Sequence, residues 1–255
     1  MLLALFWTIT SPYMNKTSKA LHKYRFKETD KLFFTSDTHF GHTKIIGYAN
    51  RPFDSVEEMD EMLIRNWNET VPEDGIVFHL GDFCFGNNSR WKAVLEQLNG
   101  QKYLILGNHD YKNFPPSCDH YFKRVTQQLH IYVDGQEIYL NHHPFLTFGG
   151  AYGQAWQLYG HVHSGPRDPG IGLDYGLIFK TFSTQYDVGV DNNNYRPVSY
   201  TEVKKIIAER SKLYYAAMAE RITQLRQEGV ESLPLEDPKR REYCRRVEQL
   251  AKIKQ

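Results

Sequence analysis

Apolar residues recur along the first half of the chain in two patterns that alternate with each other. Residues 31–37, 76–80 and 103–106 are short apolar runs bounded by polar residues, a pattern typical of buried strands. Between them, residues 55–67 have apolar side chains at helical spacing behind a Ser55–Glu58 capping box, and a second helix is expected at about 89–98. The alternation of strand and helix predicts an α/β fold.

The middle of the chain has the pattern of an antiparallel pair. Residues 130–133 and 137–140 flank Asp134-Gly135, a pair that favours a tight hairpin turn. Residues 186–190 are predicted to form a last short strand. Residues 164–185 are rich in Gly, Pro and Asp and indicate a long loop, which is uncommon unless it serves a site.

From Thr201 the pattern becomes helical. One apolar stripe runs to Gly229, and a short basic helix is predicted at about 239–252. We therefore divide the chain into an N-terminal arm (1–30), one domain (31–200) and a C-terminal helical extension (201–255). The stripe is a candidate surface for homo-oligomers; its members are Val203, Ile206, Ile207, Leu213, Met218, Ile222 and Leu225.

Composition excludes few classes of protein. The 255 residues are 41% hydrophobic and 24% charged with a net charge of +1, so nothing calls for nucleic acid or an acidic membrane as partner. Three widely spaced cysteines fit a reducing compartment. The apolar start is too short to span a bilayer and lacks the basic region of a signal peptide. We expect residues 1–13 to be an upstream start or a flexible arm, and the protein to be cytoplasmic.

Five short polar motifs lie at the ends of predicted strands. They are Asp37-Thr-His39, Gly81-Asp82, Gly107-Asn-His-Asp110, Asn141-His-His-Pro144 and Gly160-His-Val-His163. Turn chemistry explains each of them alone. Together they supply carboxylates, imidazoles and an amide oxygen, which are ligands of Mn²⁺, Zn²⁺ and iron. The set indicates a divalent metal site, and two ions about 3.5–4 Å apart would form the clamp used in phosphoryl displacement.

The ordered series D-x-H, GD, GNH-D, lone His and GH-x-H closely resembles the calcineurin-like metallophosphoesterases over about residues 31–200. The stretches "SDTHFGHTKII", "FHLGDF" and "VGVDNNNYRPVS" are similar to small bacterial and phage members. The resemblance implies a four-layer α/β/β/α sandwich of two mixed sheets with helices outside. It also implies two divalent ions, Mn first, with Zn, Fe or Ni as alternatives.

The resemblance assigns a role to each residue of the motifs. One ion would take Asp37, His39 and His163; the other would take Asn108, His142 and His161; Asp82 would bridge the two. His109 would stabilise the transition state or protonate the leaving group, and Asp110 would hold that imidazole in orientation. His143 stays as an alternative to His142, because strand alternation is unreliable beside a proline.

Other candidates have two interpretations each. His42 either contacts a substrate phosphate or caps a helix, and Arg51 either clamps a phosphate oxygen or is a solvated loop residue. His79 is expected to be a hydrogen-bonded core histidine, and Cys84 to be a packing residue. The aromatic residues Tyr152, Trp156 and Tyr159 either stack on a planar substrate group or cover the core.

The expected function is divalent-metal-dependent hydrolysis of a small phosphodiester, such as a nucleotide or cyclic nucleotide, by in-line attack of a metal-bridging hydroxide. A phosphomonoesterase is the nearest alternative. A nuclease is allowed by the basic stretches 239–241 and 245–246, although charged helices are more often solvated faces. A non-catalytic metal-binding scaffold that engages a partner through the tail helix is the rival from another class.

Overall fold

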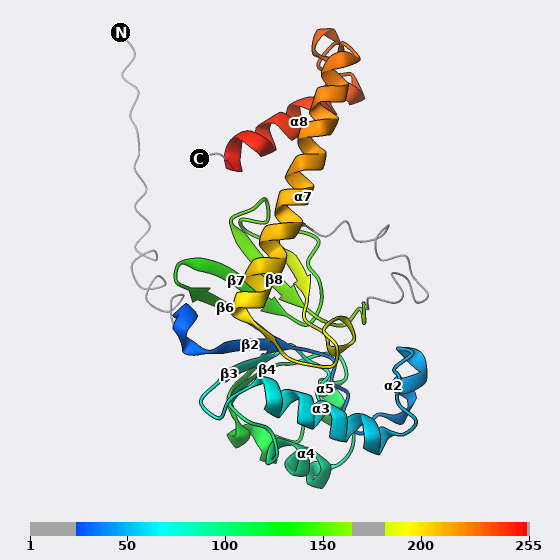
Figure 1. Ribbon diagram of the computed structural model, residues 1–255, viewed down its shortest axis with the longest axis vertical. Coiled ribbons are helices and arrows are strands. Elements are labelled where there is room, and N and C mark those ends of the chain that lie inside the picture. The colour runs from blue at the N-terminus through cyan, green and yellow to red at the C-terminus, as the bar shows by residue number, and fades with distance from the viewer. Residues whose placement is uncertain (1–23, 165–181, 254–255) are drawn as a thin grey trace, which may run out of the picture.

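The computed structural model describes residues 24–164 and 182–253, which form two five-stranded sheets and a protruding helical hairpin (Figure 1). The first sheet is parallel except for the β6–β7 hairpin. Its strand order is β1 (Arg25–Phe26), β6 (Gln128–Val133), β7 (Gln136–Asn141), β8 (Ala155–Tyr159) and β9 (Gln185–Asp187). Asp134 and Gly135 both have positive φ, which is the geometry of the predicted tight turn.

The second sheet is parallel except at one edge, where β10 runs antiparallel to β2. Its strand order is β10 (Val198–Ser199), β2 (Leu32–Thr35), β3 (Ile76–His79), β4 (Gln101–Ile105) and β5 (Phe122–Thr126). Strands β2, β3 and β4 carry apolar side chains to both faces, because each face packs against another layer. Both sheets are therefore mixed, as predicted.

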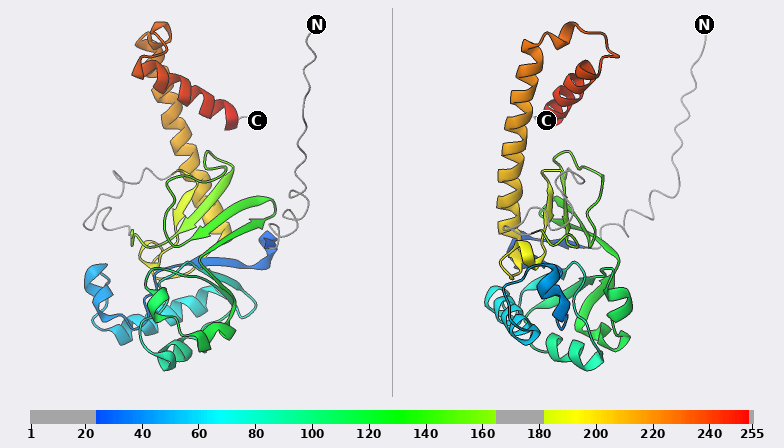
Figure 2. Two further views of the ribbon diagram at one scale, coloured as in Figure 1. Left: turned by 180° about the vertical axis from the view of Figure 1, so that it is seen from behind. Right: turned by 90° about the vertical axis from the view of Figure 1, so that its right-hand side faces the viewer.

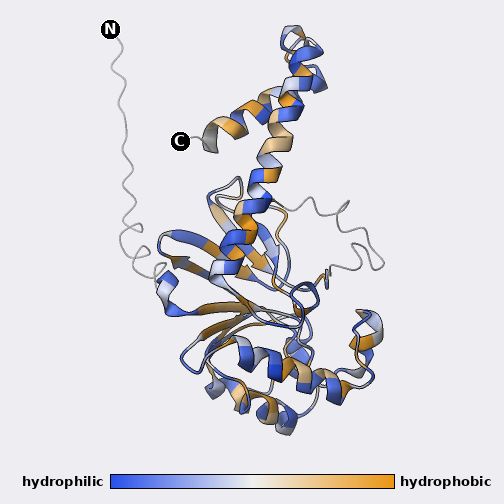
Figure 3. Cartoon of the chain, viewed as in Figure 1, coloured by the Kyte–Doolittle hydropathy of each residue, from blue (hydrophilic) through white to orange (hydrophobic). Residues whose placement is uncertain are grey.

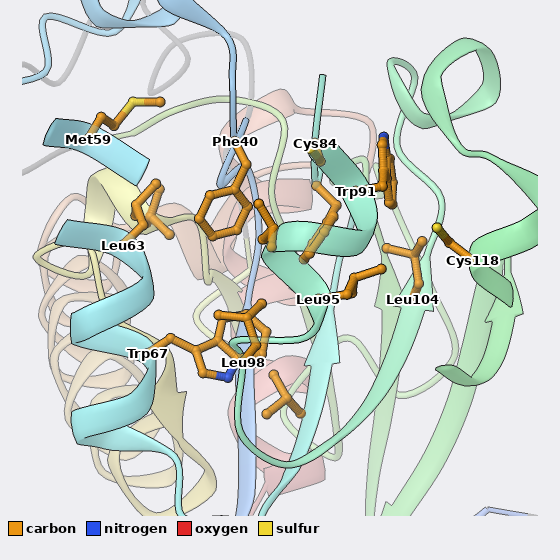
Figure 4. Packing of buried hydrophobic residues seen from close by; sticks show 14 of the residues in the cluster. Phe40, Met59, Leu63, Trp67, Cys84, Trp91, Leu95, Leu98, Leu104 and Cys118 are labelled. Atoms are coloured by element: carbon orange, nitrogen blue, oxygen red, sulfur yellow. The ribbon is translucent and has the colours of Figure 1, made fainter. Parts of the chain in front are cut away.

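Helices α3 (Val56–Thr70) and α4 (Asn88–Leu95) cover the outer face of the second sheet. Figure 4 shows Met59, Leu63 and Trp67 of α3 facing residues of α4 and β4. Ser55 caps α3 by accepting a hydrogen bond from the Glu58 N–H, but the Glu58 carboxylate accepts from the N–H of Asp54. The N-cap was predicted correctly, and the reciprocal half of the capping box shifts by one residue.

The main core lies between the two sheets. Strands of the second sheet contribute Leu32, Phe34, Phe78 and Ile105, and Leu80 joins them from the position just after β3. Strands of the first sheet contribute Leu129, Ile131, Ile138, Leu140 and Leu158. Helix α7 (Tyr200–Gln227) adds Val203 and Ile207 from its first two turns. Apolar strands inside and polar helix faces outside are visible in Figure 3. The fold is the predicted α/β/β/α sandwich of two mixed sheets.

The C-terminal extension is a helical hairpin that leaves the sandwich (Figure 2). The second half of α7 packs against α8 (Pro238–Ile253) around a separate apolar cluster. That cluster contains Met218, Ile222, Leu225, Val230 and Tyr243. Leu213, in the predicted stripe, is 62% exposed and belongs to neither core. The stripe is thus two separate contacts joined by an exposed stretch of helix.

Shorter elements complete the described chain. They are η1 (Glu28–Asp30), α2 (Thr43–Tyr48), α5 (Asp110–Asn113), η2 (Pro116–Tyr121), η3 (Val190–Asn192) and η4 (Val230–Ser232). The last residues of the predicted N-terminal arm join the first sheet through β1. Residues 1–13 and most of the predicted 164–185 loop lie outside the described residues. All three cysteines carry free thiols, and none of the described helices has the length and apolarity to cross a bilayer.

Candidate metal centre

The predicted motifs meet because they follow neighbouring parallel strands. Asp37, Asp82 and Asn108 come just after β2, β3 and β4, whose carboxyl ends lie at one edge of the second sheet. His142 and His161 follow β7 and β8 at the corresponding edge of the first sheet. The two sheets are linked there by a side chain, since the ring nitrogen Nδ1 of His142 lies 2.8 Å from the Leu80 carbonyl oxygen.

The first predicted ligand set forms a compact cluster. Asp37 Oδ1 lies 3.9 Å from His39 Nε2 and 3.8 Å from His163 Nε2. One ligand atom from each of these three residues lies within 4.8 Å of the others. Metal bonds of about 2.0–2.2 Å would hold tetrahedral donors about 3.4 Å apart, so the two distances from Asp37 Oδ1 exceed the spacing for one ion by roughly half an ångström.

Asp82 stands between this cluster and the second one. Its Oδ2 lies 3.7 Å from His39 Nε2 and 3.4 Å from His142 Nε2. Its Oδ1 instead accepts a hydrogen bond from the N–H of His109 at 2.9 Å. A bridge by Asp82 would therefore use a single oxygen, Oδ2, and not one oxygen for each ion.

The second set is completed by residues that reach His142 from other loops. Asn108 Oδ1 lies 3.0 Å from His142 Nε2, and the His161 ring lies 5.0 Å from the His142 ring. His143 is exposed but also belongs to a cluster with His142 and His161. His142 is buried and central, which favours it as the ligand, and the geometry leaves His143 within reach of the same position.

Buried polar atoms without partners show where positive charge fits. Within the described chain, Asp37 Oδ1 and both ring nitrogens of His39 are buried and accept or donate no hydrogen bond. Leaving such atoms unpaired costs about 1–3 kcal/mol each, so an arrangement of this kind needs a compensating partner. A divalent ion would supply it for Asp37 Oδ1 and for the His39 nitrogen that carries a lone pair, and the donor types suit the predicted metals.

The backbone at this centre is strained. Five of the seven predicted ligands have φ in the left-handed region, where an L residue costs roughly 1–3 kcal/mol. They are Asp37 (57°), His39 (51°), Asp82 (55°), His161 (73°) and His163 (48°). Strain of this kind persists where the surrounding structure fixes a side chain for a purpose, and here it turns the ligands toward one point.

Burial and close neighbours shift the pKa values of the clustered histidines. Burial and the neighbouring histidines hold the pKa of His39 well below its ordinary value, and burial lowers the pKa of His161 to about 4. Burial alone would also lower the pKa of His142, but the hydrogen bond to Asp82 and the charges of Asp37 and Asp82 raise it to about 9. The His39 and His161 rings are thus neutral and ready to accept a cation.

Asp110 has a different role from the predicted one. Its carboxylate accepts hydrogen bonds from the backbone N–H groups of Asp82, Phe83 and Gly107 at 2.7, 3.0 and 2.9 Å. In the described structure no bond joins it to the His109 imidazole. Asp110 therefore fixes the two loops that carry Asp82 and Asn108. The His109 side chain is 46% exposed, with Nε2 3.9 Å from Asp82 Oδ2.

Arg51 is neither a phosphate clamp nor a solvated residue. Its guanidinium is fully buried and makes a two-pronged ion pair with Asp191 at 2.8 and 2.9 Å. The remaining N–H groups donate to the carbonyl oxygens of Asp37 and Thr38 and to the Met59 sulfur. Every donor is used inside the protein, which excludes Arg51 as a substrate contact.

Asp187 and Asp191 were missed by sequence reasoning. Asp191 Oδ2 lies 2.7 Å from His163 Nδ1, and Asp187 accepts hydrogen bonds from both the backbone N–H and the hydroxyl of Ser164. The two carboxylates hold the loop that carries the last ligand. Their only signal was their place at the last predicted strand, since Asp187 lies within residues 186–190 and Asp191 directly follows them.

The remaining candidates have clear places. The His42 side chain does not cap α2. Its ring stacks on the Phe85 ring with the two ring centres 3.9 Å apart, and its buried Nδ1 has no hydrogen-bond partner in the described residues. His79 bonds to Thr38 in the core, and Cys84 is packed there, both as expected. Trp156 and Tyr159 are buried in the core region, whereas Tyr152 is 54% exposed.

The chain is similar in sequence to several known proteins. No protein-family model matches it. The uncharacterized protein MJ1445 of Methanocaldococcus jannaschii is 37% identical over 183 residues, which cover 69% of this chain and 91% of that protein. The chain belongs to the MJ1445 family. The Gene 66 protein of Mycobacterium phage D29 is 29% identical, covering 56% of this chain and 87% of the phage protein.

A solved structure supports the fold assigned to this MJ1445-family chain. The protein of unknown function AQ665 from Aquifex aeolicus aligns with a TM-score of 0.54 at 24% identity, covering 69% of this chain and 98% of its own. This likeness shows the fold alone. Two enzymes, a Pseudomonas putida nuclease and an archaeal phosphodiesterase, align at TM-scores of only 0.36 and 0.34 and carry no argument here.

Proposed function

We propose that the protein is a metal-dependent phosphoester hydrolase that acts on a phosphodiester at a centre of two divalent ions, with Mn²⁺ as the preferred metal. The observation that carries the proposal is the placement of Asp82 Oδ2 between two ligand clusters, 3.7 Å from His39 Nε2 and 3.4 Å from His142 Nε2. The order of the motifs, which resembles that of calcineurin-like metallophosphoesterases, supports it.

In this proposal the ligand set is the predicted one. Asp37, His39 and His163 would hold one ion, and Asn108, His142 and His161 the other, with Asp82 shared. Bound ions of this kind lower the pKa of water and neutralise charge on phosphate oxygens. Their positive charge would also compensate the buried Asp37 Oδ1 and one ring nitrogen of His39, which have no partner among the described residues.

His109 is the acid in this proposal. Its ring is exposed, its backbone N–H is fixed by Asp82, and its Nε2 lies 3.9 Å from Asp82 Oδ2. A protonated imidazole there would donate to the leaving oxygen of a bound ester. His42, whose ring centre lies 6.3 Å from that of His109, is proposed as a further contact to substrate oxygens.

The test uses protein stripped of metal and reloaded with Mn²⁺, assayed with an aryl phosphodiester and the matching phosphomonoester. We expect Mn²⁺-dependent turnover of the diester, lost in Asn108→Ala and in His109→Ala but kept in His143→Ala. Turnover of the monoester alone would replace the proposal with a phosphatase. Binding of two ions without turnover of either ester would favour the non-catalytic scaffold.

The nuclease alternative has its own observation. Arg241 and Arg245 lie one turn apart on α8 and, in the part of the chain that the structure describes, form no ion pair. Binding to nucleic acid through them would weaken steeply with salt. We propose a small ester as the substrate, since α8 belongs to the hairpin that protrudes from the sandwich (Figure 1). The hairpin also remains our proposed surface for homo-oligomers.

A further inference from the structure

The imidazole of His163 is held from behind by a buried carboxylate. Its Nε2 faces Asp37 Oδ1 at 3.8 Å, and its Nδ1, on the other side of the ring, lies 2.7 Å from Asp191 Oδ2. Asp191 is 9% exposed. A ring that donates from Nδ1 to a carboxylate must present the lone pair of Nε2 toward the metal cluster, which fixes both its tautomer and its angle.

Arg51 holds this carboxylate in turn. It belongs to the segment between α2 and α3, 140 positions before Asp191 in sequence, and grips it with two parallel hydrogen bonds. The same guanidinium donates to the backbone carbonyl of Asp37 at 2.6 Å. Arg51 therefore contacts the first ligand set at both ends, through the backbone of Asp37 and through the ring of His163.

A charged pair buried at this position needs a physical explanation. A buried ion pair is often no more stable than apolar residues of similar volume, so its retention calls for a role beyond stability. The arrangement supplies one, because the planar fork of arginine fixes the carboxylate in a single orientation as a lysine could not.

We propose that Arg51 and Asp191 are positioning residues that set the orientation and tautomer of His163 and thereby the affinity of the first metal position. The proposal rests on the metal centre of the proposed function. Arg51 and Asp191 lie outside the ligand motifs. They would control metal affinity at the first position, formed by Asp37, His39 and His163, and would leave the second position, formed by Asn108, His142 and His161, unchanged.

The decisive experiment removes the pair in two ways. R51M/D191L deletes both charges and the acceptor for His163, whereas R51M/D191N deletes both charges but keeps an oxygen that can accept from Nδ1. Urea unfolding of the metal-free proteins and two-site Mn²⁺ titrations followed by electron paramagnetic resonance are measured for both. The exposed pair Lys31–Asp74, replaced as K31M/D74L, is the matched control.

We expect both double variants to fold, since no charge is left unpaired. R51M/D191L should bind Mn²⁺ about 10–100-fold more weakly at one position and normally at the other, because loss of a group that orients a ligand has an effect of that size. R51M/D191N should recover part of that affinity, because it keeps an acceptor for His163 Nδ1 but loses the arginine fork that orients this acceptor. The control should match the wild type at both positions.

Wild-type affinity at both positions in R51M/D191L would overturn the proposal, as would equal weakening in the two double variants. A wild-type protein that binds no Mn²⁺ would instead overturn the proposed metal centre itself. The two failures are therefore distinguished by the wild-type titration, which is measured first.

Discussion

Asp37 Oδ2 accepts a hydrogen bond from the backbone N–H of His161 at 2.9 Å, although 124 positions separate the two residues. The other oxygen of the same carboxylate faces the first ligand cluster. One side chain thus serves as a candidate ligand and fixes the backbone of another candidate ligand, so the two sheets cannot shift at this edge without disturbing both metal positions.

Gly160 makes that contact geometrically accessible, because a Cβ at this position would overlap the side chains of Ser36 and Asp37. We expect Gly160→Ala to destabilise the protein by roughly 1–3 kcal/mol, the usual cost of overpacking, and to weaken Mn²⁺ binding at both positions. Urea unfolding and metal titration measure the two effects.

Gly47→Ala is the matched control, since Gly47 lies in α2 with nothing within 4 Å of an added Cβ. Alanine is the better helix former, so this variant should be unchanged or more stable by up to about 1 kcal/mol. Equal behaviour of the two variants would contradict the steric argument.

Asp110→Asn tests whether the Asp110 side chain fixes the backbone of neighbouring loops or orients the His109 imidazole. An amide offers one acceptor oxygen where the carboxylate serves three N–H groups, so the loops of Asp82 and Asn108 should loosen. We expect a stability loss of about 1–3 kcal/mol together with weakened Mn²⁺ binding. A variant that binds both ions normally and only turns over more slowly would restore the role in orienting His109.

His109→Ala should lower turnover without changing metal binding or stability. The side chain is exposed and lies outside the ligand sets, so metal content and unfolding should stay as in the wild type. Loss of a general acid typically lowers turnover by about 10²–10⁴-fold, with little change in KM. Steady-state kinetics with the aryl diester measures this, and loss of a bound ion from the variant would argue that His109 is a ligand.

The metal-free protein should lose stability as pH rises from 6.5 through 9. The folded-state pKa of His142 is raised to about 9, above its ordinary 6.5, so its protonated form stabilises the fold fully below pH 6.5 and no longer does so above 9. The total effect is on the order of 3 kcal/mol.

Urea unfolding between pH 6 and pH 10 provides the measurement, with His142→Gln as the comparison. The difference between the two proteins isolates His142 from the buried acids Asp110 and Asp187, whose pKa values burial raises to about 7. A difference that does not change with pH would show that His142 is not protonated in the metal-free fold.

Removing residues 218–255 should leave the sandwich intact. The distal half of α7 and α8 have an apolar cluster of their own, and the last α7 side chain in the intersheet core is Ile207. We expect the shortened chain to retain metal binding and diester hydrolysis. Size-exclusion chromatography of both lengths would test the hairpin as an oligomer surface, and an inactive, folded short form would place part of the site on the hairpin.

Sequence reasoning succeeded where one local pattern decided the outcome. The strand–helix alternation, the Asp134–Gly135 turn and the cap at Ser55 depend on neighbours in sequence, and the structure has them. Strands β1, β5, β8 and β10 were given no bounds in advance. Two of them, β1 and β10, are only two residues long, and β5 lies at a sheet edge with exposed positions.

The ligand motifs could be predicted as a set, but their supports could not. Arg51 and Asp191 lie 140 positions apart, and nothing near either residue indicates a buried partner. The family resemblance implied that Asp110 orients the His109 imidazole, but the start of α5 turns its carboxylate toward three backbone N–H groups. Such long-range pairings are decided by packing of the whole fold and leave no periodic trace.

Helix α7 belongs to two cores at once. It is a single element of 28 residues, about 42 Å long, with one end in the sandwich and the other in the hairpin cluster. A continuous helix advances about 1.5 Å and turns about 100° with each residue. The direction in which the hairpin leaves the sandwich is therefore set by the number of residues in α7. One residue added near Leu213 would rotate α8 by about 100° around the α7 axis without altering either core.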